Sequence, residues 1–223
     1  MAGPVCTKIY AAPPYNTAEI LRYAGARSAS PEVQRLLEAC CQEAWDTLSY
    51  AVCWKEIALT DTEGQQLLNQ TPSQDLRRRL HGCDRAILFG ATVGIGLDRL
   101  IARYGRVSPA KALLFQAIGA ERIEALCDLF CEDISREQAA LGRRATRRFS
   151  PGYGDLPLEL QKDLFALLDC PRKIGLTLNK SLLMSPSKSV TSLVCLSAEA
   201  ESCPDPSGCA ACQNKNCIYR RTP

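Results

Sequence analysis

The feature that most constrains the fold is a long amphipathic segment at residues 108–135, near the middle of the chain. It opens with Ser108-Pro109, a pair typical of a helix start, because proline fits the first helical turn. Gly119 costs only about 1 kcal/mol inside a helix. The segment therefore predicts a long helix with one buried stripe, made of Leu113, Ala117, Ile123, Leu126, Leu129 and Phe130.

Other segments predict helices whose ends carry recognisable caps. One helix starts at Asn16 or Thr17 and ends at Gly25, and a second starts at Ser30, where Pro31 takes the first helical position. Shorter helices are expected over residues 73–83 and 96–105. A last helix is expected over residues 156–169, with Pro157 at its start.

Strands are predicted between these helices, over residues 49–59, 86–94, 174–178 and 189–197, and residues 60–75 read as a polar loop. The strands and helices do not alternate in regular βαβ units. The chain is therefore expected to be an α+β protein with a mixed or antiparallel sheet flanked by helices. We expect a single domain over residues 1–200 and a short Cys-rich tail over residues 201–223.

Composition and charge exclude several classes. The 27 basic and 24 acidic residues leave a net charge of +3, which does not favour general nucleic-acid binding. No apolar run reaches the roughly 18 residues that a membrane span needs. The N-terminus lacks the pattern of a secretory signal, so a cytoplasmic location with reduced cysteines is expected. A single histidine, His81, excludes a site built from several histidines.

Three glycines, Gly90, Gly94 and Gly96, lie between a predicted strand and a predicted helix. A dinucleotide-binding loop would need the spacing G-x-G-x-x-G, but the third residue after Gly96 is Arg99. We interpret the glycines as a turn that lets the strand and the helix pack closely.

The stretch "RFSPGYGDLP", residues 148–157, combines an arginine with a stiff bend. The guanidinium of Arg148 can bind a carboxylate through two hydrogen bonds. Pro151 fixes one backbone dihedral, Gly152 allows close backbone approach, and Tyr153 offers a flat ring and a hydroxyl. Such a loop suits a ligand with an amino-acid end and an aromatic end. The alternative is a surface turn beside a solvated arginine cluster.

Four cysteines fall in the tail with the spacing C-x5-C-x2-C-x4-C. A C-x2-C pair can place two thiolates on one metal ion, and two further thiolates can complete a zinc site or hold an iron–sulfur cluster. The alternative is a disordered tail with free thiols. The candidate metal ligands are Cys203, Cys209, Cys212 and Cys217.

Two motifs in the same order connect the chain to a known family. Arg148, Gly152 and Tyr153 match Arg-x-x-x-Gly-Tyr, and a predicted helix follows. The next motif, Leu-Thr-Glu-Ser-x-x-Met-x-Pro-x-x-Ser-Val, is matched at Leu178, Ser181, Met184, Pro186, Ser189 and Val190. Over residues 16–196 the chain resembles the activation domain of cobalamin-dependent methionine synthase, in its stand-alone bacterial form.

This resemblance implies that the chain binds S-adenosylmethionine and supports reductive methylation of cob(II)alamin. The cobalamin would be carried by methionine synthase or another corrinoid protein, and a flavodoxin-like donor would supply the electron. The chain would then be an accessory subunit of a methyltransferase. Arg148 would hold the ligand carboxylate, next to Pro151, Gly152 and Tyr153. Ser181 and Ser189 are further candidates near the ligand.

Two departures from the family pattern concern the partner of the ligand's amino group. Asn179 and Lys180 replace the Thr-Glu pair, and Gly142 stands where the family has a glutamate. They motivate one alternative function, a non-catalytic scaffold that kept the fold but lost the ligand. The cysteines of the tail keep a second alternative open, a redox activator with an iron–sulfur cluster.

Overall fold

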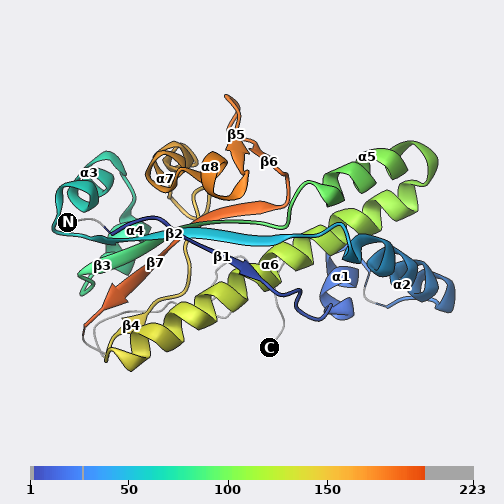
Figure 1. Ribbon diagram of the computed structural model, residues 1–223, viewed down its shortest axis with the longest axis horizontal. Helices are drawn as coiled ribbons and strands as arrows, with labels where there is room; N and C mark the ends of the chain where they lie inside the picture. The colour runs from blue at the N-terminus through green and yellow to red at the C-terminus, as the bar shows by residue number, and fades with distance from the viewer. Residues whose placement is uncertain (1–2, 27, 199–223) are drawn as a thin grey trace.

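The computed structural model describes residues 3–26 and 28–198, and within them it has both helices and strands (Figure 1). The first half contains β1 (Cys6–Tyr10), α1 (Thr17–Tyr23), α2 (Pro31–Trp45), β2 (Tyr50–Ala58), α3 (Thr62–Gln70), α4 (Gln74–Leu80), β3 (Arg85–Thr92) and α5 (Gly96–Val107). The second half contains α6 (Pro109–Ala140), β4 (Arg144–Ala145), α7 (Leu160–Leu168), α8 (Cys170–Ile174), β5 (Thr177–Leu178), β6 (Met184–Ser185) and β7 (Ser189–Ser197).

Five strands form one antiparallel sheet in the order β1-β2-β3-β7-β4, and β5 pairs with β6 in a separate hairpin. The side chains of β3 and β7 are buried along almost their whole length. Strands without an exposed face need cover on both sides of the sheet. This arrangement confirms the predicted α+β class and selects the antiparallel form of the sheet.

Helices cover both faces of the sheet and form a third core beyond its end (Figure 1). One face packs against the second half of α6, and the opposite face packs against α7 and α8. The first half of α6 packs instead with α1, α2 and α5. Helix α6 therefore belongs to two cores, and it connects the α1–α2 region to the sheet.

The buried stripe of the long helix differs from the predicted one at its N-terminal end. Leu113 is 52% exposed, whereas Leu114 and Phe115 are buried. The prediction for Leu113 is wrong because this half of the helix faces α1, α2 and α5 rather than the sheet. In the second half, Ile123 and Phe130 lie in the sheet-facing core as predicted.

Two helix caps were predicted correctly, but the segment over residues 60–75 was not. The Asn16 side chain accepts a hydrogen bond from the Glu19 N–H, and Ser30 Oγ accepts one from the Val33 N–H, which confirms both helix starts. The predicted loop over residues 60–75 is wrong, because α3 and the start of α4 lie there. Asp61 Oδ1 accepts from the Gly64 N–H at 2.9 Å and opens α3, and Leu67 is buried.

Two further boundaries shifted, and strands β1, β4 and β6 and helix α8 were not predicted. Helix α7 begins at Leu160, since residues 157–159 form turns in place of the predicted first helical turn. The predicted strand over residues 174–178 shortens to Thr177–Leu178. Strand β1 is exposed along most of its length, so it has no apolar alternation to detect.

Gly94 and Gly96 follow β3 and permit close packing against the segment before β2, whereas Gly90 lies inside β3 rather than in the predicted turn. A Cβ at Gly96 would lie 2.1 Å from the Thr47 carbonyl oxygen, and one at Gly94 would lie 2.4 Å from Ser49 Oγ. Gly94 also has a positive φ of 83°, which favours glycine. None of the helices in residues 3–26 and 28–198 is long and apolar enough to span a bilayer.

Candidate functional site

Arg148 takes its position from a bulge between β4 and β7. Ala145 pairs with Leu196, and Phe149 pairs with Leu193. The segment that carries Arg148 therefore has three residues between the two pairs, whereas β7 has two. An extra residue of this kind turns the following side chains to the other face of a sheet. Phe149 packs in the core beneath α7, and its neighbour Arg148 points to the face that α6 covers.

The Arg148 guanidinium is held by carboxylates of α6 rather than by solvent. Its Nη2 donates to Glu124 Oε2 at 2.5 Å and lies 3.9 Å from Asp128 Oδ1, and the side chain is 21% exposed. Burial disfavours the charge, but the nearby acidic side chains outweigh it and raise the pKa of Arg148 above its usual value. Arg148 is therefore a permanent cation beside two carboxylates.

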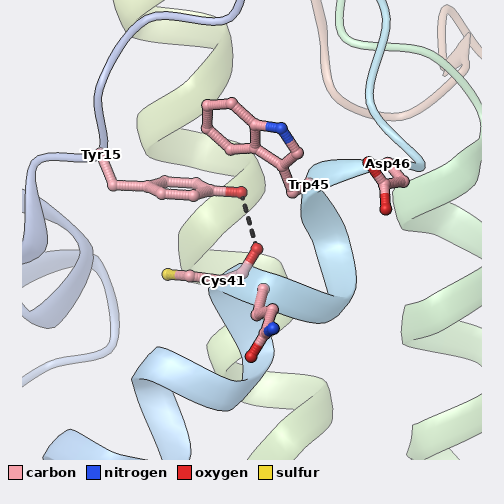
Figure 2. A pocket seen from close by; sticks show the side chains of 5 residues that line it. Tyr15, Cys41, Trp45 and Asp46 are labelled. Atoms are coloured by element: carbon pink, nitrogen blue, oxygen red, sulfur yellow. Dashed lines mark hydrogen bonds between the residues drawn. The ribbon is translucent and has the colours of Figure 1, made fainter.

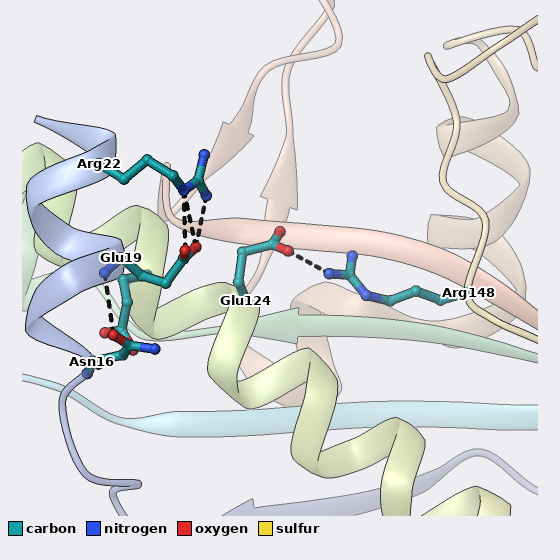
Figure 3. Close-up of polar contacts among 6 residues, drawn as sticks. Asn16, Glu19, Arg22, Glu124 and Arg148 are labelled. Carbon is teal, nitrogen blue, oxygen red and sulfur yellow. Dashed lines mark hydrogen bonds and ion pairs between the residues drawn. The ribbon is translucent and has the colours of Figure 1, made fainter. Parts of the chain in front are cut away.

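Glu124 and Asp128 also line a groove of about 700 Å³ between helix α6 and the segment Pro13–Glu19. Figure 3 shows Glu124 on α6, facing Arg148, with Glu19 and Arg22 on α1. The groove is acidic, because five carboxylates line it: Glu19, Glu121, Glu124, Asp128 and Glu132. Glu19 is already paired with Arg22 at 2.7 Å.

A buried ion pair fixes the wall of this groove opposite α6. Arg122 is fully buried, and its Nη1 and Nη2 donate to the carbonyls of Pro13 and Pro14 at 2.5 and 2.8 Å. Its partner Glu121, at 2.5 Å, accepts from the Asn16 N–H at 3.2 Å. Two adjacent side chains of α6 therefore hold the chain that leads into α1.

Tyr15 lines both the acidic groove and a smaller hollow of about 450 Å³. Figure 2 shows the residues of the smaller hollow. The Tyr15 hydroxyl donates to the Cys41 carbonyl at 3.0 Å, and its ring lies edge-on to Trp45 at 5.7 Å. The Arg122 guanidinium covers the ring at 4.3 Å. Tyr15 is thus fixed from three sides, and burial raises the pKa of its hydroxyl.

The bend after Arg148 is stiff and partly exposed. Pro151 is buried, and Gly152 has a φ of 88° that favours glycine. The Gly152 N–H donates to the Leu156 carbonyl at 2.8 Å. The Tyr153 ring is 68% exposed. These positions suit a rigid surface next to Arg148, and their contact with a ligand stays a prediction.

The two serine candidates lie in different surroundings. Ser189 is buried at the start of β7, where its Oγ lies 2.8 Å from both Thr92 Oγ1 and the Pro186 carbonyl oxygen. Ser181 is exposed in the turn between β5 and β6, where its N–H donates to Asn179 Oδ1 at 2.9 Å. Their roles at a ligand also stay predictions.

Sequence reasoning did not find the acidic partners of Arg148. Glu124 and Asp128, one helical turn apart on α6, make this contact. A signal was available. Glu121, Glu124, Asp128 and Glu132 recur every three or four residues, and this spacing places carboxylates on one side of a helix.

The structure does not test the proposed metal site in the tail. Cys203, Cys209, Cys212 and Cys217 lie outside the described residues. Within residues 3–26 and 28–198, no group of three or more His, Cys, Asp or Glu side chains is arranged to hold a metal ion.

A family model identifies the chain. The model described as "Vitamin B12 dependent methionine synthase, activation domain" matches residues 77–203, more than half of the sequence. The chain belongs to this family. The match confirms the resemblance drawn from the two motifs around Arg148 and Ser189, both of which lie inside the matched residues. No curated protein matches the chain significantly.

Solved structures show the same fold. Thirteen chains match, among them the "Crystal Structure of the MetH Reactivation Domain bound to AdoHcy". That match has a TM-score of 0.58 and 13% sequence identity, and it covers 86% of this chain and 78% of the other. At such low identity the likeness concerns the fold of the activation domain alone.

Proposed function

We propose that this chain binds S-adenosylmethionine and acts as an activation subunit for a corrinoid methyltransferase of the methionine synthase type. The observation that carries the proposal is the pairing of Arg148 with Glu124 beside a groove lined by carboxylates. The family supports the ligand class, and the similar reactivation domain is bound to AdoHcy, which lacks only the transferable methyl group.

The charges of the groove, together with that of Arg148 beside it, complement those of this ligand. S-adenosylmethionine carries an ammonium, a sulfonium and a carboxylate. Acidic side chains favour the two cations, and an arginine fork favours the carboxylate. A groove of about 700 Å³ also falls in the range of pockets that bind small molecules.

The ion pair in the structure indicates how the ligand would enter. Its amino-acid end carries one carboxylate and one ammonium, the counterparts of Arg148 and Glu124. The ligand can therefore replace their direct 2.5 Å contact, with its carboxylate on Arg148 and its ammonium on Glu124 or Asp128. This supplies the acidic partner that the family pattern left unassigned at Gly142, Asn179 and Lys180.

The chain's role would be to position a methyl donor. When bound, S-adenosylmethionine supplies a methyl group to the reduced cobalt of a corrinoid, which a partner protein carries. The residues of this chain need not donate or accept a proton; they bind and orient the ligand. The electron would come from a flavodoxin-like donor in the cytoplasm. We also propose that residues 1–200 form a single domain and that the cysteines of the tail bind a metal.

Calorimetric titration with S-adenosylmethionine tests the proposal. Wild-type protein should release or absorb heat with one site per chain. Arg148→Ala should weaken binding about 10- to 100-fold, the loss expected when a hydrogen bond between charged groups is removed. Arg147→Ala is the matched control, because Arg147 is the exposed neighbouring arginine and its removal changes the net charge equally.

Two outcomes would contradict the proposal. A wild-type chain without measurable binding would favour a scaffold that kept the fold and lost the ligand. Equal affinity in Arg148→Ala and Arg147→Ala would place the ligand away from Arg148.

A further inference from the structure

Two cysteines from distant parts of the sequence meet in the core. Cys53 lies on β2 and Cys170 is the first residue of α8, 117 positions later. Their Sγ atoms are 3.8 Å apart, and both residues are fully buried in the core between the sheet and helices α7 and α8. Both thiols are free in the structure.

Gly90 provides the space in which these sulfur atoms meet. It lies opposite Cys53 in the pairing of β2 with β3. A Cβ at Gly90 would be 3.0 Å from Cys170 Sγ and 3.6 Å from Cys53 Sγ. Glycine inside a central strand weakens the strand, and it often marks a close approach of other atoms. Here the atoms that approach are the two thiols.

The contact also makes the two thiols unequal. The hydrogen bond from Cys170 stabilises the Cys53 thiolate and lowers the pKa of Cys53. The same interaction, together with burial, raises the pKa of Cys170. A thiolate is the nucleophile in disulfide exchange, so Cys53 is the member of the pair suited to react first.

We propose that Cys53 and Cys170 form a reversible disulfide when the protein meets a small-molecule disulfide such as oxidised glutathione. The Cys53 thiolate attacks one sulfur of the oxidant and releases the first small thiol. Cys170 then attacks Cys53 Sγ, forms the S–S bond and releases the second small thiol. The two protein thiols lose two electrons and two protons, and the oxidant gains both as it becomes two thiols.

The fold can accommodate this bond with a local adjustment. A disulfide requires a sulfur–sulfur distance of about 2.05 Å, so the two atoms must approach by about 1.8 Å. Cys53 is fixed in a central strand. Cys170 begins a helix of five residues and follows Asp169, whose φ is 48°. Movement of this short helix would both expose the thiols to the oxidant and bring the sulfur atoms together.

The bond would tie helix α8 to the middle of the sheet. Because it closes a loop of more than 100 residues, it restricts the unfolded chain strongly. The melting temperature of the oxidised protein should therefore rise by about 5–15 °C. The link is independent of the proposed ligand site, which lies across the sheet beside α6.

Peptide mapping of the full chain tests this inference. The protein is treated with oxidised glutathione, blocked with iodoacetamide, digested and analysed by mass spectrometry. We expect one peptide pair that joins Cys53 to Cys170 and separates on reduction with dithiothreitol. The same pair should be absent from Cys53→Ala and from Cys170→Ala. Cys195→Ala should retain it, because this buried cysteine of the same core is the matched control.

The wild-type map decides the matter even if a variant fails to fold. The inference is overturned if Cys53 and Cys170 are both alkylated after the oxidised protein is unfolded. It is also overturned if either residue is joined to another cysteine, including one of the four in the tail. A joined pair without a rise in melting temperature would contradict the expected restraint of the unfolded chain.

Discussion

Replacing Arg122 with methionine should destabilise the protein more than any exposed charge substitution. Arg122 is 0% exposed, and it bonds to Glu121 and to the carbonyls of Pro13 and Pro14. Removing one partner of a buried ion pair costs about 3–5 kcal/mol, because the other charge stays buried without compensation. For a chain of this size the melting temperature should fall by roughly 6–20 °C. Thermal unfolding followed by circular dichroism measures the fall.

Two comparisons isolate the cause of this effect. Arg136→Met removes an arginine from the same helix, but Arg136 is 76% exposed in its pair with Asp133, so the cost should stay below about 1 kcal/mol. Adding Glu121→Gln to Arg122→Met should restore part of the loss, since no unpaired carboxylate is then buried. If Arg122→Met melts within about 2 °C of wild type, the pair does not hold the groove wall as argued.

Two further predictions concern packing and pH. Gly96→Ala should lower the free energy of unfolding in urea by about 1–3 kcal/mol, because its Cβ would lie 2.1 Å from the Thr47 carbonyl oxygen. The control Gly105→Ala has open space around it and should stabilise helix α5. Equal effects of the two substitutions would refute the packing argument. Hydrogen bonds from Lys8 and Tyr10 lower the pKa of Asp133, so its stabilisation is present above the unfolded pKa near 4 and is lost as the pH falls through the folded value. Asp133→Asn should therefore flatten the acid limb of the stability curve, and an unchanged limb would contradict this.

Local signals in the sequence predicted most of the helices and the central strands. Asn16 and Ser30 cap their helices through their own side chains, and both are recognisable from the residue type and the hydrophobic spacing that follows. The apolar runs of β3 and β7 are buried on both faces, which matches their composition. Strand β1 could not be found this way, because its place at the edge of the sheet depends on pairing with β2.

The partners of Arg148 depend on contacts that no local pattern encodes. The motif located the arginine, but its direction follows from the extra residue between Ala145 and Phe149, and that bulge exists only relative to β7. The carboxylate that it meets comes from Glu124, 24 positions earlier on another element. The acidic spacing on α6 was visible in the sequence, but the face of the sheet that it approaches was not.

Three acidic residues that line the groove differ in burial, and this difference separates the one with a structural role from the two proposed to bind the ligand. The side chains of Glu121, Glu124 and Asp128 are 6%, 27% and 52% exposed. Glu121 pairs with Arg122 and accepts a hydrogen bond from the Asn16 N–H. A ligand that bound Glu121 instead would leave the buried Arg122 guanidinium without its carboxylate partner. Glu124 and Asp128 remain accessible to solvent and share Arg148. The ammonium group of the proposed ligand would therefore take over their contacts at a small desolvation cost. A cationic ligand should therefore compete for Glu124 and Asp128 and leave the Glu121–Arg122 pair intact.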